Sequence, residues 1–157
     1  MKHTISILVE NKFGVLARVA GLFSARGYNI DSLTVSETED ASVSRMTVVV
    51  NAQDERILEQ IKKQLHKLID VITVIDFTKK EYIERELVFV KLAVPKKAQP
   101  RFKKMLTKAG AAVLEKKGES FIVELVADQE RVSDFLSGLK ELKIVELVRS
   151  GRTAIAK

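Results

Sequence analysis

The chain has 157 residues, of which 46% are hydrophobic and 31% charged, and it contains no cysteine. This composition excludes a disordered chain, and the lack of cysteine excludes disulfides, thiolate metal sites and cysteine nucleophiles. Apolar stretches stay far below the roughly 20 residues that cross a bilayer, so we expect a cytoplasmic protein with no membrane segment. The net charge is +6, but the basic residues are mostly interleaved with glutamates, which favours a solvated charged surface over a nucleic-acid-binding surface.

The sequence offers few residues for catalysis. His3 and His66 are the two histidines, and neither has a second ligand at metal-binding spacing. Glycine-rich dinucleotide and phosphate loops and the Gly-x-Ser-x-Gly elbow do not occur in the sequence. We therefore predict no catalytic residue and no metal site.

The first half of the chain alternates strand and helix patterns. Ile5, Ile7 and Val9 recur at a spacing of two, which predicts a half-buried strand over residues 4–10. After a loop that contains Gly14, apolar residues follow helical spacing from Val15 to Arg26, with Gly27 as the expected C-cap. The elements expected next are strands over 29–36 and 45–51, a helix capped by Asp54 and a strand over 71–78.

The second half repeats this order. The pattern predicts a strand over 86–94, a helix over 100–109, strands over 112–115 and 120–126, a helix from Asp128 and a strand over 144–149, followed by a polar tail. We therefore expect an α+β protein of two consecutive ferredoxin-like βαββαβ domains, over residues 1–78 and 79–157. Such a sheet leaves one face and its edge strands uncovered, which predicts a homodimer.

The most informative stretch lies where the first strand gives way to the first helix. Free backbone N–H groups at the start of that helix, together with its dipole, suit a carboxylate, and Gly14 allows close approach of a ligand. A structural interpretation stands beside this one: Gly14 turns the chain, and Asn11 forms a local bond to the backbone.

Several runs of the sequence resemble a known family. They are Leu8 to Asn11 with Gly14 to Leu16, residues 21–35 (GLFSARGYNIDSLTV), residues 44–47 (SRMT) and residues 59–71. The first half resembles an ACT domain, and in particular that of the regulatory (small) subunits of acetohydroxyacid synthase, also called acetolactate synthase. Residues 84–87 and 144–152 resemble the C-terminal domain of that family, so the resemblance covers nearly the whole chain.

This resemblance implies a regulatory function. It implies a non-catalytic subunit that binds a thiamine-diphosphate-dependent catalytic subunit, raises its activity and mediates feedback inhibition by a branched-chain amino acid, typically valine. It implies no cofactor in this chain, with thiamine diphosphate, Mg and FAD only on the catalytic partner. In the implied homodimer, Asn29 and Ile30 of one protomer face the loop of the other. The effector-binding residues that it implies are Asn11, Gly14, Val15, Leu16, Asn29 and Ile30.

Two alternatives share the βαββαβ order. A pair of RNA-binding modules of the RRM type would carry aromatic residues on the central strands, and the strands predicted over 4–10 and 45–51 contain none. A free-standing amino-acid sensor would need the same loop and stays open. Neither the loop nor the composition distinguishes valine from leucine or isoleucine, because one methylene in an apolar pocket contributes only roughly 1 to 3 kcal/mol.

Overall fold

The computed structural model describes residues 2–51 and 55–157. Its contacts divide the chain into two compact units, one formed by Met1–Ile83 with Arg152–Lys157 and the other by Glu84–Gly151. The domain limits expected from the sequence, 1–78 and 79–157, stay a prediction. The grouping of the last six residues with the first unit was not foreseen.

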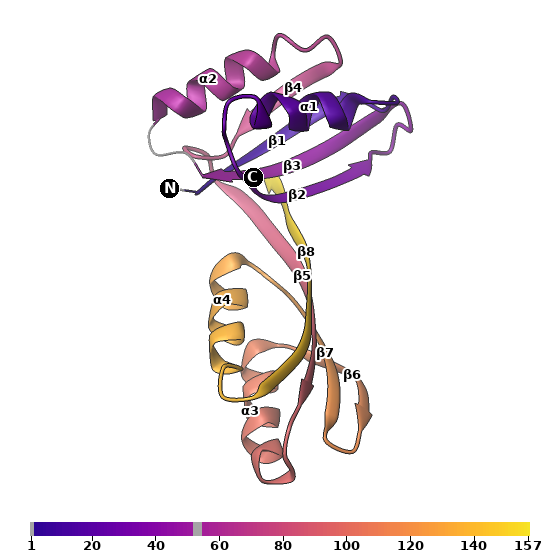
Figure 1. The fold of residues 1–157 in the computed structure, drawn as a ribbon, viewed down its shortest axis with the longest axis vertical. Coiled ribbons are helices and arrows are strands. Elements are labelled where there is room, and N and C mark those ends of the chain that lie inside the picture. Colours follow the sequence, from indigo (N-terminus) through magenta and orange to yellow (C-terminus); the bar gives the residue numbers. More distant parts are fainter. Residues whose placement is uncertain (1, 52–54) are drawn as a thin grey trace. The chain divides into compact units, whose positions relative to one another are not determined.

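The first unit is an antiparallel sheet with both of its helices on one face (Figure 1). The strand order is β2-β3-β1-β4, so β1 is a central strand that pairs with β3 on one side and with β4 on the other. The elements are β1 (Lys2–Glu10), α1 (Val15–Ser24), β2 (Ile30–Glu37), β3 (Val43–Asn51), α2 (Glu55–Leu65) and β4 (Val71–Asp76).

The alternation seen in the sequence produces this arrangement. Ile5, Ile7 and Val9 all lie on the helix-covered face of β1 and are fully buried. The helices contribute one apolar stripe each, because apolar residues three and four apart share a helix face. The helix residues buried in this core are Val15, Val19, Leu22, Phe23, Leu58, Ile61 and Leu65. Asp54, the predicted cap of α2, lies outside the described residues.

The second unit repeats the topology, with strand order β6-β7-β5-β8. The predicted pair of ferredoxin-like βαββαβ folds is therefore confirmed. Asp128 caps α4 as expected, since its side chain accepts a hydrogen bond from the Arg131 amide. The elements are β5 (Tyr82–Ala93), the short 3-10 helix η1 (Lys96–Ala98), α3 (Gln99–Ala109), β6 (Ala112–Lys117), β7 (Ser120–Ala127), α4 (Gln129–Gly138) and β8 (Lys143–Ala156).

The expected polar tail is wrong. β8 continues through Gly151, which has a φ of +85°, to Ala156. The Arg152 amide donates to the Ser32 hydroxyl, and the Thr34 hydroxyl donates to the Arg152 carbonyl, so the segment Arg152–Lys157 lies against β2. Ala154 within this segment is buried. The sequence pattern gave no sign of this, because the partners of the segment lie 118 and 120 residues away.

The second face of the first sheet is therefore less open than expected. Ser6, Thr47 and Val49 point away from the helices, yet they are only 1%, 3% and 1% exposed. The C-terminal segment contributes to this cover, because Ser32 and Thr34 pair with Val49 and Thr47 and so lie on the same face. The edge strand β2 stays accessible, with Val35 42% exposed.

A charge at the buried position of this segment should destabilise the first unit. We expect Ala154→Asp to lower its free energy of unfolding by about 1 to 3 kcal/mol, because an unpaired carboxylate would be buried there. The neighbouring Ile155 is 64% exposed, so Ile155→Asp should change stability by less than about 0.5 kcal/mol. Both tyrosines, Tyr28 and Tyr82, belong to the first unit, so tyrosine fluorescence during urea unfolding reports on it. Equal stability of the two variants would contradict the packing of this segment.

Candidate effector site

The loop between β1 and α1 ends in an open helix N-terminus. Gly14 is the N-cap residue of α1 and has a φ of +80°, a conformation that glycine adopts without steric cost. No side chain caps the helix, and its first turn contains no acidic residue. The amides of Leu16 and Ala17 have no acceptor within the helix, because the helix begins at Val15. The combined N–H groups and helix dipole suit a carboxylate.

The loop is held in place by contacts to two neighbouring loops. The backbone N–H of Asn11 donates to the Ser42 carbonyl at 2.7 Å, and the backbone N–H of Glu10 donates to the Asp70 carbonyl at 2.9 Å. Asp70 also forms an ion pair with Arg18 on α1, with Nη2 and Oδ2 2.8 Å apart. The sequence analysis did not identify Arg18 or Asp70, since they are 52 residues apart. They orient the start of α1 relative to the strands.

Both asparagines of the predicted site have their amide nitrogens occupied. Asn11 Nδ2 donates to the Ala41 carbonyl at 2.9 Å, and Asn29 Nδ2 donates to Asp31 Oδ1 at 2.8 Å. Neither bond uses the side-chain oxygen, which remains an acceptor. Lys2 and Asn29 donate to Asp31 and hold the pKa of its carboxyl below the ordinary value. In each residue the side-chain oxygen is an acceptor that an ammonium group could use.

The apolar residues of the predicted site differ in their surroundings. The Val15 side chain is 3% exposed in the core, and its amide donates to the Lys12 carbonyl at 3.3 Å. Leu16 is 44% exposed on α1, and Ile30 is half-buried at the edge of the core. The structure thus leaves the Leu16 and Ile30 side chains accessible to an apolar ligand.

The two halves of the predicted site lie at opposite ends of the sheet. Glu10, which precedes the loop, pairs with Val43 at the start of β3. Ile30 pairs with Val50 near the end of β3. Seven residues along a strand span about 23 Å. One protomer therefore does not bring Asn29 and Ile30 to the loop that contains Asn11 and Gly14.

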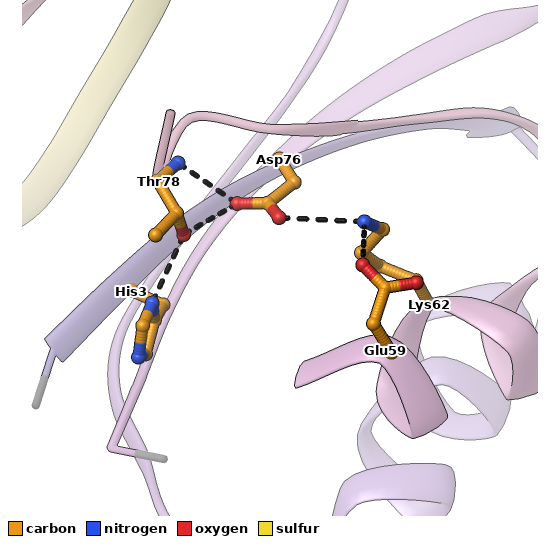
Figure 2. Close-up of polar contacts among 5 residues, drawn as sticks. All are labelled: His3, Glu59, Lys62, Asp76 and Thr78. Atoms are coloured by element: carbon orange, nitrogen blue, oxygen red, sulfur yellow. Dashed lines mark hydrogen bonds and ion pairs between the residues drawn. The ribbon is translucent and has the colours of Figure 1, made fainter. Parts of the chain in front are cut away.

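A second polar cluster of the first unit links β1, α2 and the end of β4 (Figure 2). His3 Nδ1 lies 2.9 Å from the Thr78 hydroxyl, which donates to Asp76 Oδ1 at 2.6 Å. Lys62 lies between Asp76 and Glu59, at 3.4 Å and 2.5 Å. Burial raises the pKa of Asp76, but the Thr78 hydroxyl and amide and the charge of Lys62 outweigh it, so the pKa is lowered overall. All five side chains have partners here, which indicates a structural clamp.

Other classes of site find no support. Among the described residues no group of three or more histidine, aspartate or glutamate side chains is arranged to hold a metal ion. Within the same part of the chain, no helix has the length and apolarity needed to cross a bilayer. The arrangement that remains is a helix N-terminus with the side-chain oxygen of Asn11 on the same loop, which suits one end of a small zwitterion.

Comparison with known proteins identifies the family of the chain. Residues 5–73 match a family model described as the AHAS small subunit-like ACT domain, and residues 85–157 match one described as the small subunit of acetolactate synthase. The chain is therefore an ACT-domain protein with a second ferredoxin-like unit. It belongs to the family of acetolactate synthase small subunits, and as such it is a regulatory chain without catalytic activity of its own.

The chain matches nearly the full length of the relatives compared. The chain is 43% identical over 157 residues to the probable acetolactate synthase small subunit of Archaeoglobus fulgidus, covering all of this chain and 98% of that one. It is 38% identical to the small subunit of acetolactate synthase isozyme 3 of Escherichia coli, covering 100% and 96%. The crystal structure of the small subunit from Thermotoga maritima aligns with a TM-score of 0.89 at 31% identity, covering 100% and 98%.

The pH dependence of stability should reveal the clamp around Asp76. Because the folded-state pKa is lowered, the ionised carboxyl stabilises the protein above its unfolded pKa of about 4, and this stabilisation is lost as the pH falls through the lowered value. Asp76→Asn should cost about 1 kcal/mol at pH 7 and progressively less toward pH 2. Urea unfolding across this range tests the expectation. A cost that does not change with pH would show that the charge of Asp76 has no part in it.

Proposed function

We propose that the chain binds the thiamine-diphosphate-dependent catalytic subunit of acetolactate synthase, raises its activity and makes it sensitive to feedback inhibition by valine. The catalytic partner would hold thiamine diphosphate, Mg and FAD, and this chain would hold the amino acid alone. We expect both subunits in the cytoplasm. The family supports a regulatory role, and the geometry of the loop supports an amino-acid effector.

The separation of the two half-sites carries the proposal. The loop lies at the Val43 end of the first sheet, and Asn29 and Ile30 lie at its Val50 end. Glu37, at the end of β2, pairs with Ser44 and so lies at the same end as the loop. If two β2 edges pair antiparallel across a two-fold axis, Asn29 of the partner subunit lies at this end too. A homodimer would then complete two equivalent sites, each from both protomers.

Each part of an α-amino acid finds a counterpart in this arrangement. The carboxylate would accept hydrogen bonds from the open amides at the start of α1, which the helix dipole reinforces. The ammonium would donate to the side-chain oxygens of Asn11 and of Asn29 from the partner subunit. Leu16 and Ile30 would contact a small apolar side chain such as that of valine.

Binding at such a site favours one arrangement of the dimer, because the ligand contacts both protomers. Inhibition follows if this arrangement couples less well to the catalytic subunit than the unliganded one does. A coupling free energy of about 1 to 3 kcal/mol, which is typical of allosteric proteins, is sufficient. Activation requires only association, so the two effects should be separable by mutation.

A carboxylate in the loop should abolish inhibition without abolishing activation. We expect Gly14→Asp to raise the valine concentration for half inhibition at least about tenfold, because the new charge repels the ligand's carboxylate and competes for the helix amides. Gly14→Asn is the matched control, since it carries the same backbone strain at φ +80° without the charge. The measurement is acetolactate synthase activity of the reconstituted complex against valine. If Asp and Asn at this position behave alike, charge at the helix N-terminus is not the cause.

Mixed dimers should show that two protomers share each site. Gly14→Asp and Asn29→Ala should each lose valine binding as homodimers. A dimer with one subunit of each kind contains one site with both changes and one site with neither. After subunit exchange, calorimetry should recover about a quarter of the wild-type number of sites, because about half of the dimers are mixed. Zero recovery in dimers shown to have exchanged would place the site within one protomer.

A further inference from the structure

A pocket on the face of the first sheet that lies away from the helices takes no part in the proposed effector site. Its volume is about 330 Å³, and its walls come from β2, the hairpin loop that follows it, β3 and the C-terminal segment. Arg45 belongs to the SRMT run that the sequence analysis singled out and that no role described above uses. We call this the β2–β3 pocket, and the lining residues that matter here are Glu37, Glu39, Arg45, Thr153 and Ala154.

Arg45 is the cation of the β2–β3 pocket. It pairs with Leu8 in the register of β1 and β3, which places its side chain on the face away from the helices. The guanidinium is half-buried, and Nη1 donates to the hydroxyl of Ser6 at 2.8 Å. Ser6 is 1% exposed, so this bond satisfies a buried hydroxyl. Within residues 2–51 and 55–157, no carboxylate forms an ion pair with Arg45.

The chemistry of such a guanidinium is specific. Arginine remains charged at any physiological pH and presents a planar set of donors that matches a carboxylate with two parallel hydrogen bonds. The other charged lining residues are Glu37 and Glu39, which are exposed. Glu37 pairs with Ser44 and so directs its side chain to the helix-covered face, which leaves Glu39 in the hairpin loop as the acidic group on the side of Arg45. A zwitterion matches both signs, with its carboxylate at Arg45 and its ammonium at Glu39.

We propose that the β2–β3 pocket binds a second free α-amino acid with a small side chain. Its volume lies at the lower end of the range of about 300 to 1,000 Å³ that is usual for small-molecule sites. Ala154 supplies an apolar surface for the side chain, whereas Val35 pairs with Met46 and so directs its own side chain to the helix-covered face. The site lies wholly within the first unit and is formed by one protomer, unlike the shared effector site.

Occupation of this pocket would stabilise the C-terminal segment. Thr153 and Ala154 form one wall, and the segment is held by the bonds of Arg152 to Ser32 and Thr34. A ligand that contacts both Arg45 and the wall formed by Thr153 and Ala154 would add contacts that exist only when the C-terminal segment lies on the sheet. Ligand binding should therefore slow hydrogen exchange in Arg152–Lys157.

The test uses the full chain carrying Gly14→Asp, so that the effector loop does not contribute. L-alanine is titrated while NMR signals of Thr34, Arg45 and Thr153 are followed, with hydrogen exchange of the C-terminal segment as a second readout. L-lactate lacks the ammonium and L-alaninamide lacks the carboxylate, and each should bind at least about tenfold more weakly than alanine, since each loses a charged hydrogen-bond partner. Arg45→Gln should weaken alanine binding by a similar factor, whereas Ser6→Ala, which leaves the guanidinium in place, should retain it.

Several results would overturn the proposal. Lactate binding equal to alanine binding would show a simple anion site. Shifts confined to residues 11–16, or none at all, would show that the pocket takes no amino acid. If Arg45→Gln leaves alanine binding intact, or weakens only association with the catalytic subunit, Arg45 does not hold a free ligand. If Arg45→Gln does not fold, Arg45→Lys should fold, and it should still bind alanine, though more weakly. Loss of valine inhibition in Gly14→Asp is independent of all these outcomes, so this proposal and the proposed function can fail separately.

Discussion

The central position of β1 between β3 and β4 is the constraint on which the first unit depends. Because β1 pairs on both sides, its register determines where the chain leaves the sheet, at Glu10, and where α1 begins. Gly14 then turns the chain with a positive φ, so the helix starts without a cap beside the end of the strand. An open helix N-terminus at the end of a strand that is paired on both sides would suit the carboxylate of the proposed effector, because neither the amides nor the strand would need to rearrange on binding.

The same register explains why the proposed site would be incomplete in one protomer. The start of β2 and the loop after β1 lie at the two ends of β3, and no rotation of side chains spans the length between them. A sensor built in this way would report on the dimer, since ligand binding and the arrangement of two subunits would be linked. The bond between Asn29 and Asp31 fixes the side-chain amide of Asn29, which would reduce the ordering that binding of the proposed effector requires.

The features predicted from sequence are those with local causes. The alternation of Ile5, Ile7 and Val9 and the cap at Asp128 act over a few residues, and both were predicted correctly. The C-terminal segment was predicted wrongly because its partners, Ser32 and Thr34, lie more than a hundred residues away. The orientations of the Asn11 and Asn29 side-chain amides were also not predicted. The Asn11 amide is oriented by the Ala41 carbonyl. The Asn29 amide is oriented by the carboxylate of Asp31, which forms an ion pair with Lys2.

The C-terminal segment also changes how the second face of the first sheet is understood. From the sequence, that face was expected to need a second copy of the chain as its cover. In the structure, residues from the end of the chain lie on it, and the edge strands β2 and β4 remain accessible. A dimer through β2 edges then uses backbone pairing, which fixes the register of the two protomers, and leaves the β2–β3 pocket within each. Because Arg152–Ala156 is the end of β8, which begins in the second unit, a ligand in the proposed pocket would contact that strand directly.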